Sequence, residues 1–215
     1  MCAMKSDYFT SKLINTQAEE LLSDLKLKHR RSIFWEKPAL LVLDMQQYFL
    51  DPNSHAFVPS APALIPGISQ LVQGFREKGH PVIFTQHINT PGNAGMMANW
   101  WRDLITSDHP LADLTNKLEV GDSPVIEKSQ YDAFLSTDLE MRLKEWVVTD
   151  VVITGVMTHL CCETTARSAF MHGYQVWFAV DGTATYNVDF HKSTLINLSH
   201  GFATPVLVRE LLAAL

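Results

Sequence analysis

The sequence predicts an α/β fold, in which a doubly wound, mostly parallel six-stranded sheet carries helices on both faces. Short apolar runs alternate with helical patterns along the chain, and this alternation is typical of repeated strand–helix units around a parallel sheet. The chain has 215 residues, of which 47% are hydrophobic, and this suits one soluble domain with a core large enough to fold alone. We therefore expect a single domain over residues 1–215, with an N-terminal helical extension at about residues 1–37.

The individual elements follow from local patterns. Short apolar runs predict the strands, and the longer segments between them predict helices. Gly79 and Gly173 follow two of these segments directly, where glycine favours a helix stop. In chain order, we expect helix 17–28, strand 39–43, helix 63–78, strand 81–85, strand 124–127, helix 137–145, strand 151–154, helix 161–172, strand 175–180, helix 189–198 and strand 205–208.

Three of the expected strands end near residues with reactive side chains. Asp44 and Lys128 each come directly after a short apolar strand, and Cys161 lies where strand 151–154 gives way to a helix. The partial positive charge of a helix N-terminus should make a thiol there ionise more readily. Because ligands bind beyond the carboxyl ends of the strands in such sheets, the three side chains can converge on one site.

A thiol, a carboxylate and an ammonium together suit nucleophilic catalysis. The thiol needs a proton acceptor, and a neighbouring ammonium favours the charged forms of both the carboxylate and the thiolate. Each residue alone also has a structural explanation. Free cysteine is among the most buried residue types, an aspartate at a strand end often forms a turn, and a lysine there is often solvated.

Four segments of the chain carry a resemblance to a known family. Residues 43–49 (LDMQQYF), 127–134 (EKSQYDAF), 155–167 (GVMTHLCCETTAR) and 180–184 (VDGTA) occur in the family's order. The chain thereby resembles the isochorismatase-like cysteine hydrolases, which include nicotinamidases, N-carbamoylsarcosine amidase and biuret hydrolase-like enzymes. Several spaced motifs are more specific than any one of them, and the resemblance extends from about residue 38 to the C-terminus.

The resemblance implies a catalytic triad and a reaction. Cys161 would be the nucleophile, Asp44 the general base and later the general acid, and Lys128 the electrostatic organiser of both. Attack on a substrate carbonyl would form a covalent thioester-like intermediate, which water then hydrolyses. The family also has a cis peptide bond, here between Val156 and Met157, and an oxyanion hole formed by the backbone N–H groups of Met157 and Cys161.

We further expect Gln86, Trp100, Trp101 and Tyr131 to line the substrate pocket, with the stretch 89–99 as a loop over the site. The alternative for the tryptophans is ordinary packing or a subunit contact.

The resemblance does not extend to a metal site. Nicotinamidases bind a metal through an Asp-x-His pair after the second strand plus further histidines, and here His87 and Asn89 occupy the positions of that pair. We therefore expect no metal and no cofactor, and nicotinamide becomes a less favoured substrate.

The leading hypothesis is thus a cysteine-dependent hydrolase of a small amide, ureido or related C–N compound. One alternative is an isochorismatase-type vinyl-ether hydrolase, since true isochorismatases share His159 but lack the cysteine at position 161. Another alternative is a non-catalytic binding or scaffold protein that kept the fold. The presence of Cys161 favours C–N hydrolysis.

Charge and cysteine content limit the partners. The net charge of −6 predicts no nucleic-acid or membrane partner, and the basic cluster at residues 26–31 complements the dipole of the first expected helix. Three cysteines, Cys2, Cys161 and Cys162, make no disulfide framework and indicate a reducing, cytoplasmic location. No signal peptide or transmembrane segment is expected. We expect a small-molecule substrate and a homo-oligomer.

Overall fold

The fold is described by a computed structural model, which covers residues 5–25 and 32–215. The last part of the expected helix 17–28 and the basic cluster at residues 26–31 lie outside the described residues. In chain order, the elements are α1 (Ile14–Ser23), β1 (Pro38–Leu43), α2 (Gln47–Leu50), η1 (Ala61–Leu64), α3 (Ile65–Glu77), β2 (Val82–His87), α4 (Met97–Trp100), β3 (Val125–Lys128), α5 (Leu139–Glu145), β4 (Asp150–Val156), η2 (Thr158–Cys162), α6 (Glu163–Met171), β5 (Gln175–Ala184), α7 (Val188–Gly201), β6 (Thr204–Val206) and α8 (Val208–Ala213).

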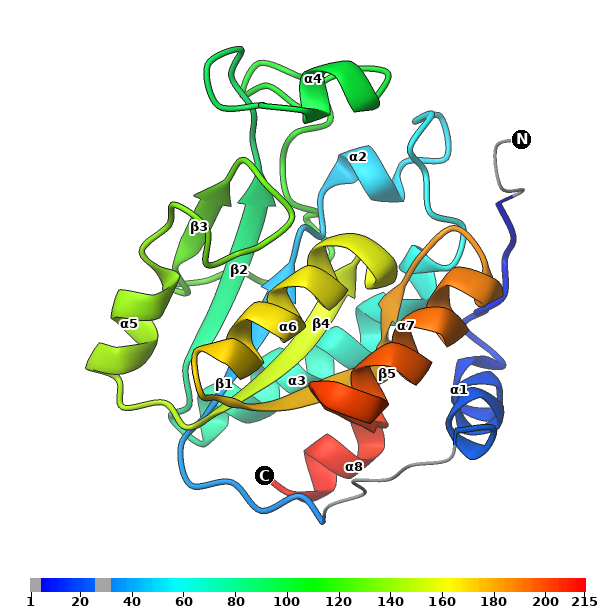
Figure 1. Cartoon of the computed structure of the whole chain (residues 1–215). Coiled ribbons are helices and arrows are strands. Elements are labelled where there is room, and N and C mark those ends of the chain that lie inside the picture. Colours follow the sequence, from blue (N-terminus) through cyan, green and yellow to red (C-terminus); the bar gives the residue numbers. More distant parts are fainter. Residues whose placement is uncertain (1–4, 26–31) are drawn as a thin grey trace.

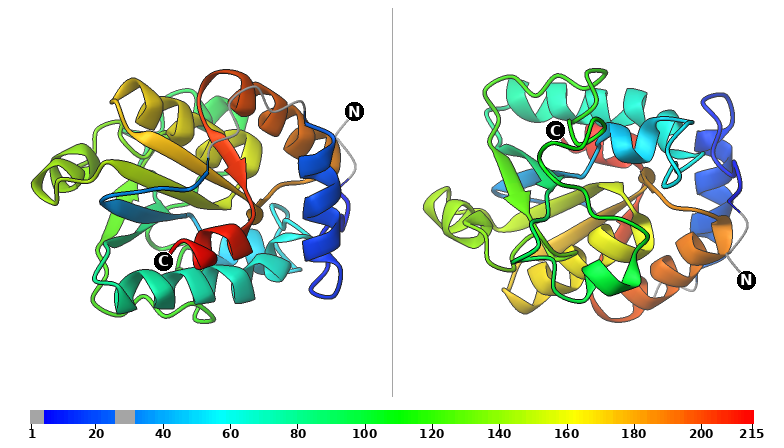
Figure 2. Two further views of the ribbon diagram at one scale, coloured as in Figure 1. Left: turned by 90° about the horizontal axis from the view of Figure 1, so that it is seen from below. Right: turned by 90° about the horizontal axis from the view of Figure 1, so that it is seen from above.

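The six strands form one parallel sheet in the order β3-β2-β1-β4-β5-β6 (Figure 1). Helices α3 and α8 cover one face of the sheet, and α6 and α7 cover the other (Figure 2). The predicted doubly wound α/β fold is therefore confirmed. The direction of strand addition reverses between β1 and β4, and the crevice at such a reversal is where sheets of this kind bind ligands.

The apolar runs form the central strands because both faces of the sheet are covered. Every residue of β1 and of β4 is buried, as expected for parallel strands between two helical layers. Strand β5 continues four residues beyond its expected end at residue 180, to Ala184, and its register with β4 shifts between Ile153 and Gly155.

Several element boundaries differ from the sequence prediction, which also did not include the helices α2, α4 and α8. The expected helices 17–28 and 189–198 are Ile14–Ser23 and Val188–Gly201. The expected strand 205–208 ends at Val206, and Val208 begins α8. Two carboxylates fix the start of α8. The carboxylate of Asp181 accepts a hydrogen bond from Val208 N at 2.7 Å, and that of Glu210 accepts one from Leu207 N at 2.8 Å. The expected helix at Cys161 begins earlier, with the π-helical turn η2 at Thr158.

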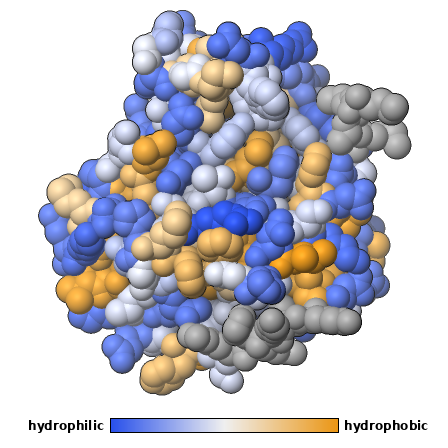
Figure 3. Space-filling model, viewed as in Figure 1, coloured by the Kyte–Doolittle hydropathy of each residue, from blue (hydrophilic) through white to orange (hydrophobic). Residues whose placement is uncertain are grey.

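The surface carries no dominant apolar patch on the face in Figure 3, where hydrophobic residues are scattered among hydrophilic ones. Among residues 5–25 and 32–215, no helix combines the length and the apolar character that crossing a bilayer requires. The short helices α2 and α4 lie above the carboxyl ends of the strands (Figure 1), and they frame the cavity described next.

Candidate active site

The structure brings Asp44, Lys128 and Cys161 together at the carboxyl edge of the sheet. The Nζ atom of Lys128 lies 2.7 Å from Oδ2 of Asp44 and 3.4 Å from Sγ of Cys161. All three residues are buried. Since β2 separates β3 from β1, Lys128 must reach Asp44 across two strand spacings of about 4.8 Å each. Only a long side chain can span that distance, which explains why the cation of this group is a lysine at the end of an outer strand.

Asp44 is held by its neighbours on both adjacent strands. Its backbone takes the left-handed conformation, with φ of 50°. Thr85 on β2 accepts a hydrogen bond from Asp44 N at 3.2 Å and donates one through Oγ1 to Oδ1 of Asp44 at 2.6 Å. On the β4 side, Gly155 has φ of 108°, and a Cβ atom there would lie 2.0 Å from the carbonyl oxygen of Leu43. Glycine is therefore required where β4 approaches the end of β1.

Lys128 has three N–H donors, and each faces an acceptor. Besides Asp44 and Cys161, the ammonium donates to the carbonyl oxygen of Gln130 at 2.9 Å. Burial alone would raise the pKa of Asp44, but the ammonium 2.7 Å away outweighs burial and lowers it. Burial likewise opposes the charge of Lys128, but Asp44 raises the pKa of the ammonium. The pair is thus ionised at neutral pH.

The thiol of Cys161 behaves differently from the sequence prediction. Burial raises its pKa to about 12; Lys128 opposes this shift, and the negative Asp44 adds to it. The expectation that this thiol ionises more readily is therefore wrong, because burial beside a carboxylate raises its pKa. The site therefore holds a neutral thiol next to an ionised carboxylate.

Cys161 lies in a tight turn that begins at Met157. The peptide bond between Val156 and Met157 is cis. The carbonyl oxygen of Met157 accepts hydrogen bonds from Leu160 N at 3.0 Å and from Cys162 N at 3.2 Å, and the second of these is the i to i+5 pattern of a π-helix. Met157 and Cys161 both line the adjacent cavity.

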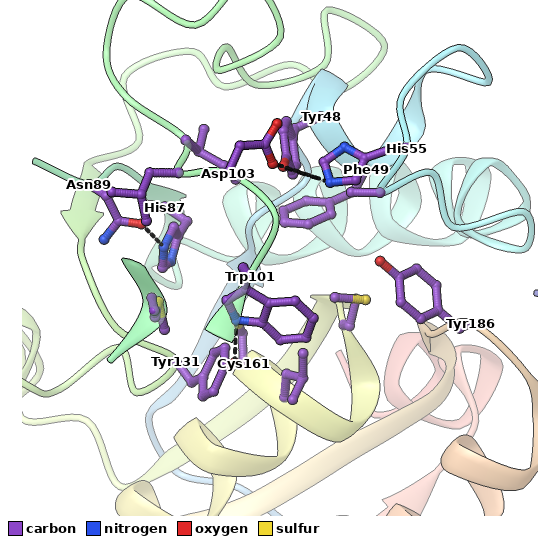
Figure 4. A pocket seen from close by; sticks show the side chains of 16 residues that line it. Tyr48, Phe49, His55, His87, Asn89, Trp101, Asp103, Tyr131, Cys161 and Tyr186 are labelled. Atoms are coloured by element: carbon purple, nitrogen blue, oxygen red, sulfur yellow. Dashed lines mark hydrogen bonds and ion pairs between the residues drawn. The ribbon is translucent and has the colours of Figure 1, made fainter. Parts of the chain in front are cut away.

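Cys161 lines that cavity, and five of the 16 lining residues are aromatic (Figure 4). Trp101 and Tyr131 line it, and Trp101 Nε1 donates a hydrogen bond to the Tyr131 hydroxyl at 2.7 Å. The structure places the other two expected pocket residues elsewhere. The Gln86 amide points away and donates to the carbonyl oxygen of Ala112 at 3.0 Å, since neighbouring side chains on a strand face opposite ways.

Trp100 also lies outside the cavity, at the end of the short helix α4, and is 74% exposed. The stretch 89–99 does lie beside the site, as expected of a loop over it, and Asn89 and Met97 line the cavity.

A polar group on the cavity wall was missed from the sequence. The Tyr48 hydroxyl donates to Oδ1 of Asp103 at 2.5 Å, and Nε2 of His55 lies 3.2 Å from the same oxygen. These three residues, together with Tyr186, line the cavity (Figure 4). They come from separate segments with no shared spacing. Tyr48 alone lies in one of the recognised motifs, so no sequence pattern joins them.

The residues after β2 do not fit a metal site. Nε2 of His87 lies 2.9 Å from Oδ1 of Asn89, whose Nδ2 donates to the carbonyl oxygen of Ser129 at 2.9 Å. The Lys128 ammonium lies 3.4 Å from Nδ1 of His87, so a cation there would face a buried positive charge. Over the described ranges of the chain, no three His, Cys, Asp or Glu side chains are grouped to hold a metal.

His87 is also kept neutral by its surroundings. Burial lowers the pKa of His87 to about 4, and Lys128 adds to that shift. His159 is the second residue of η2. Its Nδ1 lies 2.6 Å from Thr185 Oγ1, and its ring stacks on Phe190. Burial lowers the pKa of His159 to about 4 as well. Neither imidazole therefore carries a charge at neutral pH.

Comparisons with known proteins find similarities over most of this chain. A family model for the isochorismatase domain matches residues 38–210. Nicotinamidase 3 of Arabidopsis thaliana is 38% identical over 170 residues, which cover 77% of this chain and 82% of that relative. A cysteine hydrolase from Pseudomonas syringae pv. phaseolicola has a similar structure, with a TM-score of 0.81 and 24% identity over 86% of this chain and 95% of that chain. Pyrazinamidase of Pyrococcus horikoshii in complex with zinc has a TM-score of 0.72 and 25% identity over 80% of this chain and 99% of that chain.

Proposed function

Because the chain belongs to the isochorismatase family of hydrolases, as its four motifs predicted, we propose that it is a cysteine-dependent hydrolase of a small amide, ureido or related C–N compound. The observation that carries this proposal is the placement of the Lys128 ammonium 2.7 Å from Asp44 and 3.4 Å from the Cys161 sulfur, beneath an aromatic cavity. The similarity to Nicotinamidase 3 supports an amide as the substrate.

The first half of the proposed reaction forms an acyl-enzyme. Because the thiol is neutral and Asp44 is ionised, the Cys161 proton passes to the Asp44 carboxylate as the sulfur attacks the substrate carbonyl carbon. The carbonyl oxygen becomes an oxyanion, which the N–H groups of Met157 and Cys161 stabilise. Asp44 then returns its proton to the substrate nitrogen, the C–N bond breaks, and ammonia or an amine leaves a thioester on Cys161.

Water completes the cycle through the same groups. Asp44 accepts a proton from a water molecule as the water oxygen attacks the thioester carbonyl carbon. The tetrahedral intermediate expels the Cys161 sulfur, which takes the proton from Asp44, and the carboxylic acid product leaves. Lys128 stays protonated throughout and offsets the negative charge that moves between Asp44 and the sulfur. Each turnover consumes one water and restores the neutral thiol.

The charge of the cavity favours an uncharged substrate. Its wall contains the carboxylate of Asp103, and none of the described residues that line it is a lysine or an arginine. His87, which also lines it, is neutral because its pKa is about 4. A carboxylate-bearing substrate would lose its hydration and would meet the Asp103 carboxylate, with no lysine or arginine on the described wall. We therefore propose an uncharged amide with an apolar or aromatic acyl group. Nicotinamide has this character. The missing Asp-x-His pair made it a less favoured substrate, but the similarity to Nicotinamidase 3 revises that expectation and makes nicotinamide the first compound to test.

Ammonia release from a panel of amides tests the proposal. The panel contains uncharged amides, including nicotinamide, and ureido acids that carry a carboxylate. We expect turnover of uncharged compounds, and Cys161→Ala should lower kcat by at least about 1,000-fold, since it removes the nucleophile. Cys162→Ala is the matched control, because Cys162 is adjacent and buried but lies in the hydrophobic core. It should keep kcat within about threefold.

The outcomes separate the proposal from its alternatives. A trapped acyl group should add its mass to Cys161 in the wild-type enzyme. A fully active Cys161→Ala variant would contradict the cysteine mechanism. Hydrolysis of a vinyl ether that needs Asp44 but survives Cys161→Ala would favour the vinyl-ether hydrolase. No turnover in the panel, together with no acyl adduct on Cys161, would favour a binding or scaffold protein.

Location and assembly complete the proposal. A cytoplasmic location is supported by two neighbouring free thiols, Cys161 and Cys162, which a reducing compartment preserves. A homo-oligomer is supported by Met96 and Trp100, which are 71% and 74% exposed beside the cavity. Light scattering should give a mass above that of one 24.2 kDa chain, and a monomer mass would remove this part of the proposal.

A further inference from the structure

The segment 5–9, which precedes the part of the chain matched by the family model, contacts two residues of the cavity wall. The ammonium of Lys5 donates to the carbonyl oxygens of His55 at 2.5 Å and Phe57 at 2.9 Å. It also lies 4.3 Å from the centroid of the Tyr186 ring. His55 and Tyr186 both line the cavity, so one cation joins the loop after α2 to the turn after β5.

Further bonds tie this N-terminal strap (residues 5–9) to the same two segments. Ser6 N donates to the carbonyl oxygen of Tyr186 at 2.8 Å. The Tyr8 hydroxyl accepts a hydrogen bond from Thr185 N at 2.9 Å. On the other side, Ser60 Oγ accepts hydrogen bonds from the backbone N–H groups of Tyr8 and Phe9, each at 3.0 Å.

The strap is also anchored in the protein interior. Phe9 at its end is 1% exposed and belongs to the hydrophobic core. The strap therefore has one end fixed by apolar packing, while Lys5 at the other end holds the wall of the cavity.

The parts of the wall that the strap contacts lie outside the strands and helices. His55 lies between α2 and η1, and Tyr186 lies between β5 and α7, so neither belongs to a strand or helix. In Figure 4, both lie on the opposite side of the cavity from Tyr131 and His87. Loops outside the ladder of the sheet move more readily than the strands that carry Asp44 and Lys128.

We infer that the N-terminal strap sets the position of this wall, so that Lys5 is a positioning residue that limits the size of the substrate's acyl group. For the substrate, this inference rests on the proposed amide hydrolysis. The size of the cavity can be tested without turnover, because an alkylating reagent must pass through the cavity to reach the Cys161 sulfur.

Alkylation of Cys161 by a small and a bulky reagent measures the cavity directly. The rates with iodoacetamide and N-phenyl iodoacetamide are followed by peptide mass spectrometry at mildly alkaline pH. Lys5→Met removes both hydrogen bonds and the cation over Tyr186, and it should raise the ratio of the bulky to the small rate by at least about fivefold. Lys5→Arg keeps a cation and donors, and should restore most of the wild-type ratio.

The matched control is Lys12→Met, because Lys12 is an exposed lysine that lies just after the strap. It should leave the ratio within about twofold of wild type. Tyr8→Phe gives an independent test, since it removes the acceptor of Thr185 N, and should also raise the ratio. An unchanged ratio in both Lys5→Met and Tyr8→Phe would overturn the inference. Equal acceleration of both reagents with a lower melting temperature would show a purely structural role and overturn it too.

Turnover adds a second readout. With amides of increasing length, Lys5→Met should lower KM for the longest amides by about fivefold, because the wall no longer limits their size. The values of kcat and of KM for the shortest amide should stay within about twofold of wild type. Loss of kcat for every amide alike would contradict a positioning role. If no amide is hydrolysed by the wild-type protein, the proposed function fails, and the alkylation ratio alone decides whether the strap shapes the cavity.

Discussion

Replacement of Lys128 by methionine tests the electrostatics of the site most directly. Lys128 and Asp44 form an ion pair at 2.7 Å, and both side chains have no solvent exposure. Methionine keeps much of the lysine stem's volume but removes the charge, so Lys128→Met leaves Asp44 as a buried carboxylate without its counter-ion. Breaking a buried pair by removing one partner typically costs about 3–5 kcal/mol of folding free energy. We expect Lys128→Met to lose this much free energy of unfolding at about pH 8.

The loss should depend on pH in a defined direction. In the wild-type protein, the pKa of Asp44 is lowered, so its stabilising contribution is present above the unfolded-state pKa and is lost only as the pH falls through the folded-state pKa. In Lys128→Met, burial without a counter-ion raises the pKa of Asp44 above its unfolded-state value. That group then favours the folded state at low pH, and the contribution is lost as the pH rises through the raised pKa.

Urea unfolding of both proteins between about pH 5 and about pH 8 measures this difference. The free energy of unfolding of Lys128→Met, relative to wild type, should fall by about 1.4 kcal/mol per pH unit below the raised pKa. Over the whole range the deficit should grow by at least about 1.4 kcal/mol. Protonation of the neighbouring His87 at low pH would act in the same direction, because its charge would also compensate Asp44.

The double variant Lys128→Met/Asp44→Asn is the matched control. It removes both charges, so its deficit should be smaller at about pH 8 and should not change with pH. A deficit for Lys128→Met that stays constant over the whole range would refute the reasoning. That result would mean that Asp44 does not take up a proton when its partner is removed, and that the pair does not set the charge of the site.

Two further predictions concern the backbone and the pH dependence of turnover. Gly155→Ala should destabilise the protein by at least about 3 kcal/mol, because the new Cβ would lie 2.0 Å from the carbonyl oxygen of Leu43 at a φ of 108°. Gly201→Ala, where nothing lies within 4 Å, should change stability by less than about 1 kcal/mol in the same thermal unfolding measurement, and equal effects would contradict the close approach at Gly155. For an uncharged amide, kcat/KM should stay flat between about pH 5 and about pH 8, because the pKa of Asp44 is lowered and the pKa of His87 is about 4. A loss of activity between about pH 6 and about pH 7 would instead indicate a titrating histidine in the mechanism.

The reactive residues could be predicted from the sequence because local pattern places them at one edge of the sheet and the resemblance to the family selects them from the other residues there. Apolar runs mark the strands, and parallel strands with helical crossovers bring their carboxyl ends to one edge. Asp44 and Lys128 come at the ends of such runs, and Cys161 follows a third. The sequence therefore predicts that the three residues converge, while the turn after β4 and the long side chain of Lys128 set the distances of 2.7 and 3.4 Å.

The protonation of the site was not predictable in the same way. The sequence shows that Cys161 lies near the start of a helix, but it does not show how completely the thiol is buried or that Asp44 lies beside it. Burial and that carboxylate raise the pKa of the thiol to about 12, which reverses the expected ionisation. The magnitude of desolvation depends on the packing of distant segments, and no local pattern carries it.

The sheet and the three reactive residues near its strand ends follow from the sequence, because periodicity acts over a few neighbouring residues and each motif is a short local pattern. The cavity follows from the packing of the whole chain. That packing directed Gln86 and Trp100 away from the cavity, and it joined Tyr48 to Asp103, 55 positions later in the chain. It also placed Lys5 against Tyr186. Contacts of this kind form between loops that have no repeating pattern, so they are set by the packing of the whole chain rather than by any segment of it.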